Sequence, residues 1–191
     1  MRIAVFTGSH AGPPSHAEAA AAFARNLAKA GVGIVYGGGH VGLMGVVADA
    51  VLAGGGEAIG VIPQALADRE IAHSGLSDLR VVDSMHTRKA LMADLSDAFI
   101  AMPGGVGTFE EIFEAITWTQ LGVHRKPCGF LNAAAFYTPL IAFIDQAVSE
   151  GFIKPVHRQM IVVDDNPERL LDTLGATVLP DVPKWIRQDQ T

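Results

Sequence analysis

One stretch decides the fold: Ala98-Phe99-Ile100-Ala101-Met102-Pro103-Gly104-Gly105-Val106-Gly107-Thr108-Phe109-Glu110-Glu111. Its apolar run stops at Pro103, three glycines follow within four residues, and apolar side chains then recur at helical spacing from Phe109. This order predicts a strand, a glycine loop and a helix. Because glycine leaves the backbone open and the N–H groups at a helix N-terminus attract oxyanions, the loop suits a phosphate.

The composition is typical of a globular α/β protein. Of the 191 residues 49% are apolar, 21 are glycine and only 7% are aromatic. We expect one domain over residues 1–191, in which residues 181–191 form a loose tail. The formal net charge is -6 and there is no basic block, so we expect no nucleic-acid partner.

Cysteine use and hydropathy predict a cytoplasmic protein. The single cysteine, Cys128, allows neither a disulfide framework nor a zinc cluster within one chain. The apolar run at residues 3–6 ends at Thr7-Gly8-Ser9, which is too early for a signal peptide. No apolar run reaches the length of a membrane span, so we expect no membrane partner either.

Short apolar runs alternate with helical patterns along the chain. We expect strands at residues 3–6, 32–36, 58–62, 79–82, 98–102, 128–131 and 161–163. We expect helices at residues 15–30, 43–52, 85–95, 109–121 and 136–148, and a last one from residue 167. In the first helix, Ser15 and Glu18 form a capping box and Gly31 ends the helix. Residues 64–77 lack periodicity and fit a lid or a connecting segment.

Strands that are apolar throughout predict a parallel sheet covered on both faces. With right-handed crossovers, the fold class is α/β, a Rossmann-like doubly wound and mainly parallel sheet of about seven strands in a single domain. The glycine loops that follow residues 6, 36 and 102 then meet at the carboxyl edge of the sheet. We expect the binding crevice there.

A second glycine run, Gly37-Gly38-Gly39, follows the expected second strand. It is not the dinucleotide fingerprint, because the loop after the first strand lacks G-x-G-x-x-G and no acidic residue follows at the ribose-reading distance. A tight turn and the close approach of a ligand explain these glycines equally well. The loop at residues 104–107 is not a Walker A loop either, since no Gly-Lys-Ser/Thr follows, and it fits a mononucleotide phosphate better than a triphosphate.

Thr108 has two interpretations. Its hydroxyl could donate to a phosphate, but Thr108-Phe109-Glu110-Glu111 also matches the T-x-x-E capping box, which the local pattern favours. Glu110 and Glu111 diverge by roughly 100° on a helix, so we expect only one of them to face the crevice.

A carboxylate close to a phosphate needs a compensating cation. Arg88 and Lys89 start the helix after the fourth strand, near the same edge, and could supply it; a solvated helix face is the alternative. The histidines show no metal-ligand spacing, and Cys128 has no base beside it in the sequence. We therefore expect neither a metal nor another cofactor.

The P-G-G-x-G-T-x-x-E signature of the Lonely-guy (LOG) family is matched by residues 103–111. The chain thus resembles the cytokinin riboside 5'-monophosphate phosphoribohydrolases, long mistaken for lysine decarboxylases, over most of residues 3–165. The matches continue through Tyr36-Gly37-Gly38-Gly39, Gly42-Leu43-Met44-Gly45, Gly60-Val61-Ile62-Pro63, Glu70-Ile71, Met85-His86-Thr87-Arg88-Lys89, Ser96-Asp97-Ala98-Phe99, Thr117-Trp118, Gln120-Leu121-Gly122 and Lys126-Pro127.

The resemblance implies hydrolysis of the N-glycosidic bond of a nucleoside 5'-monophosphate, which gives a free base and ribose 5-phosphate. The base would be an N6-prenylated adenine or the adenine of AMP. The resemblance makes Arg88 and Glu111 the catalytic pair, in a homodimer whose site lies near the subunit interface. It assigns the nucleotide contacts to Glu70, Lys89, Gly105, Val106, Gly107, Thr108, Glu110 and Thr117. We expect the pocket wall to include Gly8, Ser9, Gly38, Gly39, Met44 and Met85.

This chemistry suits the residues. Departure of the base builds positive charge on the ribose, which a carboxylate such as Glu111 stabilises, while Arg88 orients the substrate and offsets the negative charge. One departure from the family pattern is Thr7-Gly8-Ser9-His10, where Cys-Gly-Ser-Ser is frequent; it alters the pocket wall and leaves the catalytic pair intact.

Two other functions compete with the hydrolase. A non-catalytic carrier of a nucleotide or of the molybdenum cofactor would use a similar fold and glycine loop, but it has no need of both Arg88 and Glu111. A decarboxylase that uses pyridoxal phosphate has weaker support, because neither Lys89 nor Lys126 lies in a recognisable cofactor-lysine context.

Overall fold

A computed structural model describes residues 1–69 and 71–180 of the chain. One sheet of seven strands runs through it in the order β4-β3-β2-β1-β5-β6-β7, and every pairing is parallel. The strands are β1 (Arg2–Phe6), β2 (Gly33–Tyr36), β3 (Ala58–Pro63), β4 (Asp78–Val82), β5 (Ala98–Ala101), β6 (Cys128–Leu131) and β7 (Ile161–Asp164). The predicted doubly wound α/β fold is confirmed.

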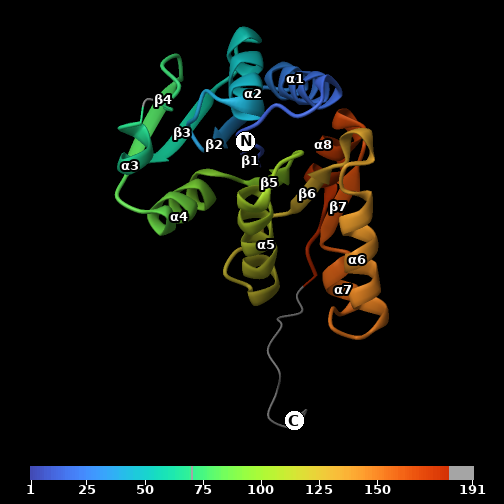
Figure 1. Cartoon of the computed structure of the whole chain (residues 1–191). Coiled ribbons are helices and arrows are strands. Elements are labelled where there is room, and N and C mark those ends of the chain that lie inside the picture. Colours follow the sequence, from blue (N-terminus) through green and yellow to red (C-terminus); the bar gives the residue numbers. More distant parts are fainter. Residues whose placement is uncertain (70, 181–191) are drawn as a thin grey trace.

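Helices cover both faces of the sheet (Figure 1). They are α1 (Pro14–Lys29), α2 (Gly42–Ala53), α3 (Gln64–Ala67), α4 (Met85–Leu95), α5 (Val106–Leu121), α6 (Thr138–Ser149), α7 (Pro155–Arg158) and α8 (Pro167–Ala176). The buried residues of α1, α2 and α8 join one core, and those of α4, α5 and α6 join the other. No helix of the described part of the chain is long and apolar enough to cross a membrane.

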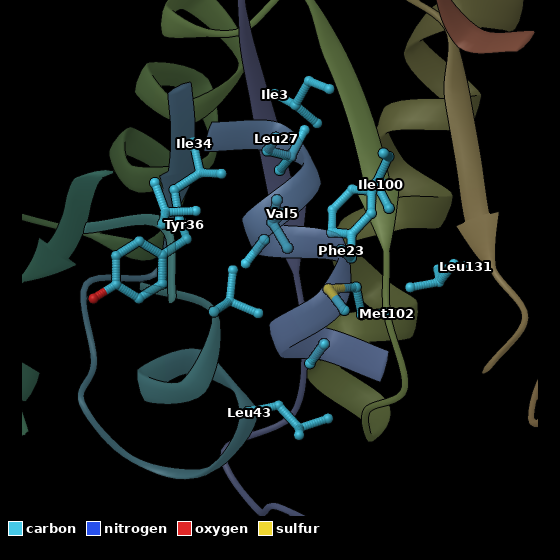
Figure 2. Packing of buried hydrophobic residues seen from close by; sticks show 14 of the residues in the cluster. Ile3, Val5, Phe23, Leu27, Ile34, Tyr36, Leu43, Ile100, Met102 and Leu131 are labelled. Carbon is cyan, nitrogen blue, oxygen red and sulfur yellow. The ribbon is translucent and has the colours of Figure 1, made fainter. Parts of the chain in front are cut away.

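Alternate side chains of each central strand point into opposite cores. From β1, Ile3 and Val5 pack with α1 and α2, whereas Ala4 and Phe6 face α4 and α5. Figure 2 shows the first core, in which Phe23 of α1 lies among side chains of β1 and β5. Burial on both sides explains why the strands read as continuous apolar runs in the sequence.

The chain reverses its direction across the sheet at β1. From β1 it builds β2, β3 and β4 on one side, and it then returns to add β5, β6 and β7 on the other. The loops after β1 and β5 are tied together, because the N–H of Gly8 donates to the carbonyl of Pro103 at 3.2 Å. The N–H of Leu43, at the start of α2, donates to the carbonyl of Gly8 at 3.1 Å. This edge is the topological switch point where α/β sheets bind ligands.

Some local predictions were wrong. The first helix begins at Pro14 with Pro13 as its N-cap and no side-chain cap, because proline is preset for the first helical position, so the Ser15 and Glu18 capping box does not form. The helix expected at residues 136–148 begins at Thr138, after a 3-10 turn at Ala133–Ala135. The aperiodic segment 64–77 contains the short helix α3, and α7 was not predicted.

Candidate active site

The glycine loop after β5 begins its helix earlier than the sequence pattern predicts. Gly105 is the N-cap of α5 with an extended backbone and no side-chain cap, and the helix starts at Val106. Thr108 is the third helical residue and is buried, and its side chain packs so closely under Gly104 that a Cβ there would overlap Oγ1. The predicted capping box of Thr108 and Glu111 is therefore wrong, because Gly105 is the N-cap and both residues lie within the helix.

The start of α5 is open to a ligand. A Cβ added at Gly105 or at Gly107 would meet nothing within 4 Å. The N–H groups of Val106, Gly107 and Thr108 belong to the first turn, where no intrahelical acceptor is in reach. These donors and the helix dipole together favour an oxyanion such as a phosphate.

Arg88 of α4 and Glu111 of α5 form a buried ion pair. Arg88 Nη2 lies 3.1 Å from Glu111 Oε1, and only 11% and 10% of their side chains are exposed. Arg88 Nη1 also donates to Sδ of Met85 at 3.6 Å, and Arg88 Nε is buried without a hydrogen-bond partner among the described residues. The alternative interpretation, that Arg88 lies on a solvated helix face, is thus excluded. Arg88 can donate further hydrogen bonds to a ligand.

The environment of Glu111 works against its charge. Burial raises the pKa of the Glu111 carboxyl above its usual value, and the guanidinium of Arg88 limits that rise. A reaction that needs the Glu111 carboxylate should therefore lose rate as the pH falls through this raised pKa. Perturbed carboxyl groups of this kind are typical of catalytic sites.

Lys89 points to a different pair of carboxylates. Its Nζ binds Glu110 Oε1 and lies 3.0 Å from Glu114 Oε2, and only 11% of its side chain is exposed. Burial disfavours the ammonium, but its hydrogen bonds to Glu110 and Glu114 outweigh burial and raise the pKa of Lys89. Glu110 and Glu111 therefore diverge as expected, each toward its own cation.

A cavity of about 280 Å³, here called the site cavity, lies in front of these groups. It brings together eleven residues that the sequence predicted for the site. They are Gly8, Ser9, Met44, Met85, Arg88, Gly105, Val106, Gly107, Thr108, Glu110 and Glu111, of which Glu110 lies at the half-exposed rim, and Thr7 joins them. The lining therefore combines the phosphate-type loop with the Arg88 and Glu111 pair in one chamber.

Four other predicted residues lie elsewhere or outside the description. Gly38 packs against Ile62, and Gly39 pairs with Ala72 in an antiparallel bridge, so neither lines the site cavity. Thr117 is exposed about three turns along α5, where its hydroxyl donates to the carbonyl of Phe113 at 2.7 Å. Glu70 lies outside the described residues, as do residues 181–191.

The sequence interpretation missed two residues of this site. Thr7 lines the site cavity, and its Oγ1 donates to the carbonyl of Pro103 at 3.1 Å; a threonine at the end of an apolar strand carries no signal for this contact. Gly37 lies against the guanidinium of Arg88, a contact between segments far apart in the sequence. Among the described residues no group of three or more metal-ligating side chains is placed to hold an ion.

Comparison with known proteins identifies a family model and sequence relatives that cover most of the chain. A family model described as "Possible lysine decarboxylase" matches residues 44–174. Over 174 residues the chain is 51% identical to the cytokinin riboside 5'-monophosphate phosphoribohydrolase LOG7 of Arabidopsis thaliana, covering 91% of this chain and 80% of that protein. The chain belongs to the LOG family. A second LOG protein, from Oryza sativa, is 51% identical over 162 residues, or 84% of this chain and 67% of the relative.

Solved structures share the fold at much lower identity. A molybdenum cofactor binding protein from Rippkaea orientalis superposes with a TM-score of 0.70 at 19% identity, covering 92% of this chain and 95% of that one. The molybdenum cofactor carrier protein of Chlamydomonas reinhardtii gives a TM-score of 0.68 at 19% identity, with coverage of 92% and 98%. At this identity the likeness concerns the fold alone, so the LOG family assignment rests on the sequence relatives.

Proposed function

We propose that this chain hydrolyses the N-glycosidic bond of a purine nucleoside 5'-monophosphate, giving the free base and ribose 5-phosphate. The observation that carries the proposal is the buried pair of Arg88 and Glu111, 3.1 Å apart, in the same chamber as an open helix N-terminus. The names of the relatives, which are phosphoribohydrolases of cytokinin riboside 5'-monophosphates, agree with this chemistry. The base is N6-prenylated adenine or adenine.

Each part of the site has a role in this reaction. The backbone amides of the first turn of α5, from Val106 to Thr108, hold the 5'-phosphate. This contact places the sugar next to Glu111. As the bond from C1' to the base nitrogen breaks, positive charge develops on the ribose ring and the Glu111 carboxylate stabilises it. A water molecule supplies the hydroxyl group that C1' gains. The remaining proton of that water ends on the base, which leaves as the free purine.

Arg88 helps to keep the Glu111 carboxyl group ionised. Its guanidinium favours the ionised form of Glu111 in a buried site, and its remaining N–H groups can bind the sugar or the phosphate. Lys89 lies behind this pair, held by Glu110 and Glu114. We propose that an incoming nucleotide competes with Glu110 for Lys89, since Glu110 is the more exposed of its two partners.

The alternative functions have less support. A decarboxylase of the pyridoxal phosphate type needs a lysine amine at its reaction centre. Lys89 is held by two carboxylates, Lys126 Nζ donates to the carbonyl of Ala93 at 2.7 Å, and no described residue that lines the site cavity is a lysine. A carrier remains the second candidate, favoured only by the fold of the molybdenum cofactor proteins.

The test of the proposed function is an assay of the purified protein with AMP and with isopentenyladenosine monophosphate, without added metal. We expect release of ribose 5-phosphate from at least one of them, and much slower cleavage of the corresponding nucleosides, because they lack the phosphate that anchors the sugar. If both nucleotides bind but neither is consumed at high protein concentration, the carrier function replaces the hydrolase.

We further propose that the chain acts as a homodimer in the cytoplasm. Thr117, expected to contact the nucleotide, lies outside the site cavity of its own chain and lines a separate hollow of about 390 Å³ with Phe113 and Phe152. The exposed apolar side chains of Val106 and Phe152 favour burial by a second copy. Light scattering should give twice the 20.1 kDa of one chain; a single-chain mass at the concentrations used for activity assays would contradict the dimer.

A further inference from the structure

The glycine run Gly37-Gly38-Gly39 was open to two explanations from the sequence, a tight turn or the approach of a ligand. The geometry points to a third role for its first member. We propose that Gly37 is a positioning residue, which leaves the space that the guanidinium of Arg88 needs to reach Glu111. This inference rests on the proposed function, because it gives Arg88 its importance, but the contact itself can be tested without turnover.

Residue 37 lies directly against the catalytic pair. A Cβ there would overlap Nη2 of Arg88 and would lie 3.2 Å from Cζ, with Sδ of Met44 at 3.4 Å. Nη2 is the same atom that lies 3.1 Å from Oε1 of Glu111. A single methyl group at position 37 would therefore occupy the place of the nitrogen that forms the ion pair.

The turn does not explain Gly37. The left-handed backbone of this loop belongs to Gly38, whose φ is +76°, whereas the φ of Gly37 lies outside the left-handed region. An alanine can thus adopt the backbone of residue 37 without strain. Ligand approach does not explain Gly37 either, because the missing Cβ points at Arg88 and residue 37 does not line the site cavity.

The loop cannot retreat from an added side chain. On one side of Gly37, Tyr36 pairs with Gly60 in the sheet. On the other, the N–H of His73 donates to the carbonyl of Gly38 at 2.8 Å, and the N–H of His40 donates to the carbonyl of Ile71 at 2.9 Å. With the backbone held at both ends, the flexible end of Arg88 has to move, by about 1 Å or more, to restore a normal contact distance.

The variant Gly37→Ala should therefore separate catalysis from folding. We expect kcat to fall about 100-fold, as a misplacement near 1 Å can cost. KM and the affinity for ribose 5-phosphate should stay within about threefold, because the amides of α5 are untouched. The acidic limb of the pH profile should move to higher pH, since a displaced Arg88 no longer limits the raised pKa of Glu111. Gly175→Ala, in α8 with nothing within 4 Å of the added Cβ, is the matched control.

A cycle of variants tests the contact even if no nucleotide is cleaved. Carboxyl NMR should place the titration of Glu111 at higher pH in Gly37→Ala than in the wild type. In the Arg88→Ala background the same glycine change should produce no further shift. An unchanged titration in Gly37→Ala, or an equal shift in both backgrounds, would overturn the proposal. If Gly37→Ala does not fold, the double variant must fold, because loss of the guanidinium frees the space; a double variant that also fails would overturn it too.

Discussion

Replacing Glu111 with glutamine should lower kcat about 1,000-fold and leave the fold intact. The side chain keeps its size and one oxygen acceptor for Arg88, but it loses the negative charge that stabilises the developing positive charge on the ribose. Binding of ribose 5-phosphate should persist, because the phosphate donors at the start of α5 are unchanged. The measurement is the steady-state rate of ribose 5-phosphate release, together with circular dichroism and product affinity.

The matched control is Glu114→Gln on the same helix. Glu114 lies one turn further along α5, pairs with Lys89 and does not line the site cavity, so its replacement should cost less than about tenfold in rate. A folded Glu111→Gln enzyme with more than a tenth of the wild-type rate would rule out the catalytic role of the Glu111 carboxylate.

Arg88→Ala should lower kcat about 100-fold, at least as much as the displacement of Arg88 in Gly37→Ala. Without the guanidinium, the largest influence that lowers the pKa of Glu111 against burial is lost, so this pKa rises further and the carboxylate becomes scarcer at neutral pH. Part of the loss should therefore be recovered at higher pH, and a pH profile of the variant measures this directly. Arg88→Lys should restore little, because an ammonium lacks the planar fork of donors that reaches Glu111 and Met85 together.

The control for this change is Arg80→Ala. Arg80 is exposed on the edge strand β4, where its Nε binds Asp78 at 2.6 Å, and it has no contact with the site cavity. We expect it to keep wild-type kinetics. Equal activity in Arg88→Ala and Arg80→Ala would mean that Arg88 is only a structural arginine.

The sequence predicted the sheet well because its strands carry a strong local signal. Each central strand is buried on both faces, so it reads as a short continuous apolar run, and in β5 that run ends sharply before Pro103. The position of the binding crevice could be predicted because, in a parallel sheet, the loops that follow neighbouring strands meet at one edge. The edge strand β4 is largely exposed, yet its β-branched residues still marked it as a strand.

Other features depend on contacts that no local pattern encodes. The T-x-x-E pattern at Thr108 predicts a cap, but Gly105 is the N-cap and the helix starts three residues earlier than expected, with Thr108 packed closely under Gly104. The division of Glu110 and Glu111 between Lys89 and Arg88 depends on how α4 lies against α5. The role of Gly37 was likewise invisible, because its partner Arg88 belongs to a later helix. The roles assigned to Glu70 and Thr117 stay predictions.

The most direct test of the account is the product balance of a single turnover with AMP. Wild-type protein in excess over AMP should form free adenine and ribose 5-phosphate in equal amounts, and Glu111→Gln should form neither on the same timescale while still binding ribose 5-phosphate. Formation of adenosine and phosphate, or recovery of both AMP and isopentenyladenosine monophosphate bound but intact from the wild-type protein, would contradict N-glycosidic hydrolysis at the Arg88 and Glu111 site.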